Sequence, residues 1–401
     1  MIRKTGRQSI VDEIRGMSLL GILLANMLFF QYGMWGLEEL SLFDLSRADS
    51  IAHTLLKILI EGSFMPIFAF LFGYGMLKMM EGLEAKGAKF RRVLVRRAVM
   101  LALLGLAHSL LLWEGDILMF YGFMSLFLLL FLKRKAKTVL IWGIVLLTLL
   151  SLGGIGATDS ASSTLIDKSK SEPYVQKSVE VYQNGSYSDI LHFRNNEEPP
   201  LEANKVLLVF IALLVPLLTA PMFLFGMYAA RKGWFHEAQT KRSFYAKWAV
   251  IFLIAGLIMK SLKYIWPHFI LSGVGEISGM TILAIGYLMG FGWLLSLGKA
   301  ASLRKGFEAV GRLSLTNYLM QTVICTTLFY GYGLGWFGKL GILAGIGIGI
   351  AVYIVQWLGS ALYLKRFRIG PVESLLRMGT YWSWKGKLKQ RPSQTGADMK
   401  V

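Results

Sequence analysis

The sequence predicts an all-α membrane protein in which about ten transmembrane helices form one polytopic bundle. Of the 401 residues, 55% are hydrophobic and only 17% are charged, whereas a soluble domain carries about 25% charged residues. A helix that crosses the lipid needs about 20 mostly apolar residues. The apolar stretches that approach this length are 16–36, 55–77, 93–113, 117–132, 138–156, 206–230, 244–264, 277–297, 307–330 and 338–364.

The Lys and Arg residues gather in alternate gaps between these stretches, as the positive-inside rule describes. The N-terminus, the gap after 55–77 and the tail after 338–364 are basic, so both termini are predicted to be cytoplasmic. Segment 157–203 carries more acidic than basic residues and is predicted to be a longer extracytoplasmic loop. Lys260 and Lys263, near an outer helix end, are exceptions. Topology and anionic membrane lipids thus explain the net charge of +19, and no nucleic-acid partner is predicted.

The apolar stretches divide the chain into four parts. These are an N-terminal five-span half (1–156), an extracytoplasmic loop (157–203), a C-terminal five-span half (204–364) and a cytoplasmic interfacial tail (365–401). In the loop, Val175, Val179 and Tyr182 recur at helical spacing and predict a short amphipathic helix. In the tail, Trp382 and Trp384 are typical of an interfacial helix with aromatic anchors.

His108 is the most informative polar residue within an apolar stretch. It lies roughly 16 Å along a helix from Arg97 on the cytoplasmic side. An imidazole at that depth must face the bundle interior or a hydrated cavity. One interpretation is a structural histidine bonded to a neighbouring helix. The other is a catalytic base that the carboxylate of Asp116 or Glu61 orients and makes more basic.

Stretch 307–330 supplies a second group of polar residues. Asn317 and Gln321 are four residues apart and share a helix face, and Asn26 lies at a depth similar to that of His108. Amides inside a membrane helix often bridge to another helix. Alternatively, they line one polar cavity together with His108. The residues predicted to line that cavity are Asn26, Glu61, Trp113, Tyr121 and Gln321.

Arginines collect at the cytoplasmic ends of several stretches. In the simpler interpretation, Arg15, Arg96, Arg97 and Arg312 set the topology and contact lipid. Guanidinium groups also match the geometry of phosphate, so these residues are candidates for binding a polyanionic cofactor. No metal is predicted, because the single Cys325 lies within an apolar stretch and the sequence contains no HExxH motif.

The last apolar stretch carries a stripe of small residues, Gly338, Gly341, Gly345 and Gly349. Such a stripe permits close helix packing, either within the bundle or between two copies in a homodimer. The sequence leaves both alternatives open.

Several motifs form an ordered series along the chain, namely VDEIRG at 11–16, LGILLANM at 20–27, FLFGYG at 70–75, the hairpin 104–121, GRLSLTNYLMQ at 311–321 and GPVE at 370–373. Together they resemble the YeiB-like family of bacterial membrane proteins, an uncharacterised family loosely linked to transport. The resemblance is weakest in 157–203 and departs from the family pattern at Ser374, where an aromatic residue is expected. It implies a multi-pass protein of the bacterial plasma membrane.

The opening Asp12-x-x-Arg15-Gly16 is also similar to that of multi-spanning acyltransferases, including heparan-alpha-glucosaminide N-acetyltransferase. This resemblance covers the first two stretches and implies acyl-coenzyme A, such as acetyl-coenzyme A, as donor and a histidine within the bundle. In that enzyme the histidine lies between the first two spans, where this chain has His53 rather than His108. Which histidine takes part in chemistry is left open.

Two functions follow from these patterns. In the first, the protein is an acyltransferase in which His108 is the general base or carries the acyl group transiently, Asp116 orients it and Asn317 stabilises the oxyanion. The acceptor, a small molecule or a glycan, enters from the extracytoplasmic side. The phosphates of cytoplasmic acyl-coenzyme A are bound by Arg15, Arg96, Arg97 and Arg312. In the second, the protein is a transporter or a lipid- or small-molecule-binding membrane protein, and the same polar residues line a pathway.

Overall fold

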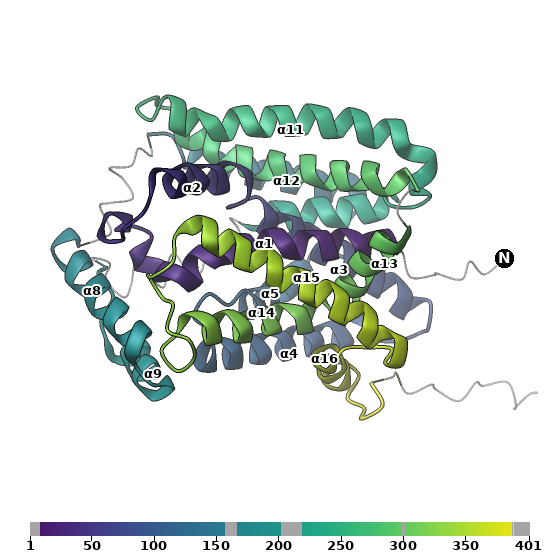
Figure 1. Ribbon diagram of the computed structural model, residues 1–401. Helices are drawn as coiled ribbons and strands as arrows, with labels where there is room; N and C mark the ends of the chain where they lie inside the picture. Colours follow the sequence, from purple (N-terminus) through teal and green to yellow (C-terminus); the bar gives the residue numbers. More distant parts are fainter. Residues whose placement is uncertain (1–8, 157–166, 202–218, 299–300, 387, 389–401) are drawn as a thin grey trace, which may run out of the picture.

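The computed structural model describes residues 9–156, 167–201, 219–298, 301–386 and 388, which fold into helices and connecting loops (Figure 1). The N-terminal half contains α1 (Ser9–Gly36), η1 (Leu40–Leu42), α2 (Arg47–Leu59), α3 (Phe64–Glu84), α4 (Phe90–Leu111), α5 (Leu118–Leu128) and α6 (Ala136–Leu152). The remainder contains α8 (Lys168–Asn184), α9 (Tyr187–Asn196), η3 (Ala238–Lys241), α11 (Arg242–Ile265), α12 (Ser272–Ser296), α13 (Ala301–Arg312), α14 (Ser314–Phe329), α15 (Ile342–Arg366) and α16 (Pro371–Tyr381).

The long helices lie alongside one another and give the bundle two distinct ends (Figure 1). Helices α8 and α9 lie across one end, which we call the cap end. Helices α13 and α16 lie at the opposite end, which we call the basic end because the arginines described below gather there. The start of α1 lies beside α13 at the basic end, and the predicted location of the two termini stays a prediction.

Among the described residues, six helical segments are long and apolar enough to cross a membrane, and α5 and α6 are shorter apolar helices. The six segments are Ser9–Gly36, Arg47–Glu84, Phe90–Leu111, Ala238–Ile265, Ser272–Ser296 and Ile342–Arg366. The predicted helical membrane fold is thus confirmed. Predicted stretch 206–230 lies mostly outside the described residues, with helix present from residue 219 onward. A total of ten spans therefore stays a prediction.

Predicted stretch 55–77 is broken between α2 and α3, where Gly62 adopts a φ of 69°. The break is stabilised by Lys260 of α11, whose side chain is buried at 2% exposure. Its ammonium group donates to the Glu61 carbonyl oxygen over 2.6 Å and to Ser63 Oγ over 3.2 Å. Lys263 forms an ion pair with Glu276 at 2.9 Å. Both exceptions to the charge rule therefore have partners within the bundle.

Helix α1 and helix α13 cross at the basic end with their backbones in contact. A Cβ atom at Gly16 would collide with the Phe307 carbonyl oxygen, and one at Gly311 would collide with the Asp12 carbonyl oxygen. Only glycine permits this approach. Because Arg15 precedes Gly16 and Arg312 follows Gly311, the crossing brings these two arginines to one region of the molecule.

Of the predicted glycine stripe, Gly345 and Gly349 lie in α15 and face the interior, whereas Gly338 and Gly341 precede the helix. A Cβ atom at Gly345 would collide with the Gln31 side chain of α1, and Gly349 faces Leu24 and Met27 of the same helix. The stripe therefore serves packing within the bundle, and the predicted homodimer stays a prediction.

The cap end consists of α8 and α9 rather than the single amphipathic helix that the sequence predicts. Helix α9 begins with a capping box in which Ser186 and Asp189 exchange hydrogen bonds, and these bonds from the Ser186 side chain and backbone lower the pKa of Asp189. Arg194 of α9 donates to the carbonyl oxygens of Ser109 and Leu112 at the end of α4 over 2.5 and 3.4 Å. The cap thus binds the last turn of α4, which carries His108.

Candidate functional site

His108 and Asp116 form a buried pair between α4 and the loop that precedes α5. The two atoms that meet, His108 Nδ1 and Asp116 Oδ1, lie 2.8 Å apart, and the two side chains are 1% and 2% exposed. The second carboxylate oxygen, Oδ2, accepts from the Met119 backbone N–H in the first turn of α5 over 2.8 Å. Gly105 makes the pair possible, since a Cβ atom there would collide with the Met119 backbone. This contact is the one expected if Asp116 orients the His108 ring, as the sequence predicts.

The other ring nitrogen of His108 contacts a residue that sequence reasoning did not single out. His108 Nε2 lies 3.0 Å from Thr322 Oγ1 on α14, and Thr322 is 1% exposed. In the tautomer with its proton on Nδ1, the neutral ring donates to the Asp116 carboxylate, and Nε2 accepts from the Thr322 hydroxyl. The one feature of the sequence that could have drawn attention to Thr322 is its polarity, because it follows Gln321 in a mostly apolar part of the stretch.

Asn317 and Gln321 bridge α14 to α15. Asn317 Nδ2 donates to Ser360 Oγ over 2.9 Å, and Gln321 Nε2 donates to Gln356 Oε1 over 2.9 Å. Gln356 in turn donates to the Asn317 carbonyl oxygen over 2.9 Å. The two amides thus take the helix-bridging arrangement, and no hydrogen bond joins them to His108 among the described residues.

The other cavity residues predicted from sequence are distributed over the bundle. Trp113 is buried and packs on Phe30 with ring centroids 4.4 Å apart. Asn26 is half-buried on α1, and no hydrogen bond joins it to His108 in the described part of the chain. Glu61 lies at the α2–α3 break with Lys260. His53 is half-buried on α2. Of the two candidate histidines, only His108 contacts a carboxylate through a described hydrogen bond.

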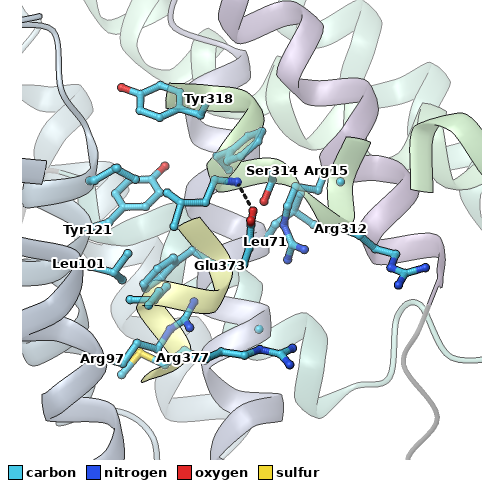
Figure 2. A pocket seen from close by; sticks show the side chains of 18 of the residues that line it. Arg15, Leu71, Arg97, Leu101, Tyr121, Arg312, Ser314, Tyr318, Glu373 and Arg377 are labelled. Atoms are coloured by element: carbon cyan, nitrogen blue, oxygen red, sulfur yellow. Dashed lines mark hydrogen bonds between the residues drawn. The ribbon is translucent and has the colours of Figure 1, made fainter. Parts of the chain in front are cut away.

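A pocket of about 310 Å³ opens among α1, α3, α4, α5, α13, α14 and α16 (Figure 2). Arginines from four parts of the chain line it toward the basic end; they are Arg15, Arg97, Arg312, Arg368 and Arg377. Figure 2 shows Arg97 and Arg377 on one side and Tyr318 on the opposite side. Three of the four arginines predicted to bind a cofactor, Arg15, Arg97 and Arg312, thus line this pocket, and their role as ligands stays a prediction.

Arg96 is the fourth predicted arginine, and it lies outside the pocket lining. Its guanidinium carbon is 5.7 Å from the ring centroid of Trp382, a cation–π contact with the end of α16. Adjacent residues on one helix turn therefore have different surroundings, with Arg97 facing the pocket and Arg96 facing an aromatic side chain.

Glu373 is the carboxylate of the pocket, and it caps α14. Glu373 Oε1 accepts from the backbone N–H groups of Leu315 and Thr316 over 2.8 and 3.1 Å, and Oε2 accepts from Thr316 Oγ1 over 2.5 Å. These bonds satisfy donors that the first turn of a helix leaves free, and they place a negative charge at its positive end. They also fix α16 against the wall of the pocket. Both carboxylate oxygens are therefore already hydrogen-bonded to α14, and the arginines give the mouth of the pocket its positive charge.

The deeper walls of the pocket are apolar and end at two tyrosines. Phe72, Leu101 and Leu118 are among the apolar lining residues, and Tyr121 and Tyr318 are each 4% exposed. The Tyr318 ring lies between the pocket and His108, with the two ring centroids 5.5 Å apart. The His108–Asp116–Thr322 group thus begins one side chain beyond the deep end of the pocket.

Comparisons with known proteins identify the family to which the chain belongs. A family model described as a protein of unknown function, DUF418, matches residues 229–383. The uncharacterized protein YxaH of Bacillus subtilis (strain 168) is 34% identical over 94% of this chain and 95% of its own length. The uncharacterized protein YeiB of Escherichia coli (strain K12) is 30% identical over 93% of this chain and 96% of its own length. The chain belongs to the YeiB-like, DUF418 family.

A further relative of this YeiB-like protein is an uncharacterized 39.9 kDa protein in the amylase 3′ region of Bacillus acidopullulyticus, 25% identical over 92% of the chain. The family resemblance predicted from the motifs is confirmed, and none of these names carries an activity.

The tail supplies site residues of this YeiB-like protein that the sequence did not predict. The aromatic residues of the tail indicate an interfacial helix, yet Glu373, Leu376 and Arg377 of α16 line the pocket. The available signal was the GPVE motif, whose Gly370 has no room for a Cβ atom beside the Glu373 carboxylate. In the described residues, no group of three or more His, Cys, Asp or Glu side chains is arranged to hold a metal ion.

Proposed function

We propose that this protein is a membrane acyltransferase that takes an acyl group from acyl-coenzyme A, such as acetyl-coenzyme A, at the cytoplasmic face of the bacterial plasma membrane. The observation that carries the proposal is the pocket, which has arginines at its mouth and the His108–Asp116 pair one side chain beyond its deep end. In this orientation the basic end and both termini are cytoplasmic. The charge pattern of the sequence supports that orientation.

The mouth and the apolar walls of the pocket suit different parts of acyl-coenzyme A, the proposed donor. Phosphates bind the guanidinium groups of Arg15, Arg97 and Arg377 at the mouth, since arginine forms bidentate bonds with phosphate oxygens. The apolar walls accommodate an uncharged arm that carries the thioester. A volume of about 310 Å³ is at the small end of the range of about 300–1,000 Å³ for ligand pockets. The arm therefore occupies the pocket, and the nucleotide lies at its mouth.

His108 is the base in this proposal. It removes a proton from the hydroxyl or amine group that attacks the thioester carbonyl, and the thiolate leaves and takes up the proton. Asp116 fixes the tautomer and stabilises the imidazolium, as in hydrolases with a Ser-His-Asp triad. An acceptor that enters from the cap end requires α9 to part from the end of α4, where Arg194 now holds it.

Donor binding by the purified protein tests this proposal, with a matched pair of variants. We expect Arg97→Ala to weaken acetyl-coenzyme A binding, measured by calorimetry in detergent, by about tenfold or more. A hydrogen bond to a charged group contributes about 1.5–3 kcal/mol, and 1.4 kcal/mol corresponds to a factor of ten. Arg96→Ala removes the same charge from the same helix turn but from outside the pocket, so its affinity should equal that of the wild type. Equal affinities for all three proteins would contradict the proposal.

A transporter is the second candidate, and one observation favours it. Ser314, Tyr318 and Thr322 recur every four residues on α14, so hydroxyl groups follow one helix face from the pocket into the bundle. In a transporter these groups line the substrate path. Uptake of acetyl-coenzyme A into proteoliposomes, without release of free coenzyme A, would favour transport over acyl transfer.

A further inference from the structure

Thr322 uses its hydroxyl group differently from four other hydroxyl side chains in the helices of this protein. Ser18, Ser125, Ser151 and Thr380 each donate to the carbonyl oxygen four residues earlier, the local bond that helical Ser and Thr commonly form. The hydrogen bond of Thr322 instead joins α14 to α4, through His108 Nε2 at 3.0 Å. Its hydroxyl is thus committed to an imidazole that a buried carboxylate orients.

The geometry of the three residues follows that of a nucleophile, a base and an orienting acid. The hydroxyl-to-imidazole distance is 3.0 Å and the imidazole-to-carboxylate distance is 2.8 Å, both within the range of about 2.6–3.2 Å for such pairs. The tautomer with its proton on Nδ1 gives the bond directions of a triad, since Nδ1 then donates to Asp116 and Nε2 accepts from Thr322. A triad is recognised by geometry and roles rather than by its order in the sequence.

Thr322 also occupies the nitrogen that a general base would use. His108 Nδ1 is bound by Asp116, so Nε2 is the remaining basic atom, and it faces the Thr322 hydroxyl. An acceptor can reach Nε2 directly only after Thr322 has moved away. The shorter route is for His108 to act on the hydroxyl it already contacts.

We propose that Thr322 is the nucleophile of the acyl transfer, so that the acyl group passes through an ester on its side chain; this inference rests on the proposed function. In the first step, Thr322 Oγ attacks the thioester carbonyl while His108 Nε2 takes the hydroxyl proton. The carbon–sulfur bond breaks, and the thiolate leaves with that proton as free coenzyme A. In the second step, the acceptor gives its proton to His108 and attacks the ester carbonyl, and the Thr322 oxygen leaves and recovers the proton.

Tyr318 controls the approach of the thioester to Thr322. It lies four residues before Thr322 on the same face of α14, a rise of about 6 Å, and it lines the deep end of the pocket. Its hydroxyl contacts the Gly115 carbonyl oxygen at 3.5 Å, a long hydrogen bond. Rotation of this ring joins the pocket to the Thr322 hydroxyl. Figure 2 shows Tyr318 at the side of the pocket away from Arg97 and Arg377.

Mass spectrometry of the acid-quenched protein tests the proposal. The full-length protein in detergent is mixed with acetyl-coenzyme A, with water as the only acceptor, and is digested after the quench. We expect one acetyl ester on Thr322 in the wild type, accompanied by a burst of free coenzyme A. Thr322→Ser should retain the ester because it retains the hydroxyl. Thr322→Val, which has nearly the same shape without the hydroxyl, should lose it and slow coenzyme A release by about 100-fold or more.

Thr326→Val is the matched control, because Thr326 is also 1% exposed and lies one turn further along α14, where it bonds to the Val323 carbonyl oxygen. It should form the Thr322 ester at the wild-type rate. An acetyl group on His108 instead, or an unchanged burst in Thr322→Val, would overturn the nucleophile and leave the acyltransferase standing. If the wild type neither binds acetyl-coenzyme A nor releases coenzyme A, the proposed function itself fails.

Discussion

Asp116 is the residue whose two oxygen atoms organise the centre of the bundle. One oxygen holds His108, and the other accepts from the first turn of α5. Both bonds require an acceptor, which a carboxylate provides twice and a carboxamide only once. The residue therefore joins α4 to α5 and fixes the proton of His108 at the same time.

We predict that Asp116→Asn lowers the stability of the protein by about 1–3 kcal/mol, because a neutral amide replaces the ionised carboxylate and weakens the bonds to His108 and to the Met119 N–H inside the bundle. Thermal unfolding in detergent, followed by tryptophan fluorescence, measures this change. Asp44→Asn is the control, since Asp44 is exposed in the loop between η1 and α2. Similar unfolding midpoints for the two variants would contradict the assigned role of Asp116.

At the residue scale, the sequence indicated which polar residues matter better than it indicated which residues they contact. His108 and Asp116 stood out because ionisable groups are costly at membrane depth, and the structure brings them together. Thr322 did not stand out, because a lone hydroxyl in an apolar helix commonly bonds to its own backbone. Asn317 and Gln321 point toward α15, because helical spacing gives the face that residues share but not the neighbour that this face meets.

Among the elements, the contact between α1 and α13 determines where the pocket arginines lie. Two glycines, Gly16 and Gly311, allow the two backbones to touch. Arg15 and Arg312 are their sequence neighbours, so a separation of the helices would widen the mouth of the pocket.

We predict that Gly311→Ala destabilises the protein and weakens acetyl-coenzyme A binding, because its Cβ atom would collide with the rigid Asp12 backbone. Overpacking of this kind costs about 1–3 kcal/mol. Gly82→Ala is the matched helical control, since a Cβ atom there meets nothing within 4 Å. That control should be neutral or slightly stabilising, because alanine favours helix more than glycine does. Unfolding midpoints and calorimetric affinities of both variants check the prediction, which a normal affinity in Gly311→Ala would contradict.

The sequence predicted most elements and missed their breaks. Apolar length alone indicated α1, α4, α11, α12 and α15, because a span requires about 20 such residues. Stretches 55–77 and 307–330 read as continuous, yet each contains two helices. The side chains that support these breaks come from distant positions, namely Lys260 for the first and Glu373 for the second. Local hydropathy cannot reveal such partners, because they are distant in the sequence.

For the molecule as a whole, Lys260 attaches the α11–α12 pair to the N-terminal half. Its buried ammonium group satisfies a carbonyl oxygen and a hydroxyl at the α2–α3 break. Inside a bundle that excludes water, those acceptors have no alternative partner. These acceptors explain why a basic residue is tolerated inside this apolar helix.

We predict that Lys260→Met lowers the stability of the whole protein by about 1–3 kcal/mol, since it leaves buried acceptors without a donor. Hydrogen exchange should increase at the start of α3 and along α11 in this variant. Lys263→Met is the control, because Lys263 and its partner Glu276 are partly exposed and such pairs contribute about 0–1 kcal/mol. Equal unfolding midpoints for the two variants would show that Lys260 does not hold the halves together.

The contact between Glu373 and the first turn of α14 also bears on the synthesis of the protein. Among the described elements, helix α16 follows all the long helices in the sequence, so the ribosome makes it after them. Until α16 docks, α14 lacks its carboxylate partner, and Arg377 has not joined the arginines contributed by earlier segments. The arginine-lined pocket is therefore complete only after α16 has been made and has docked.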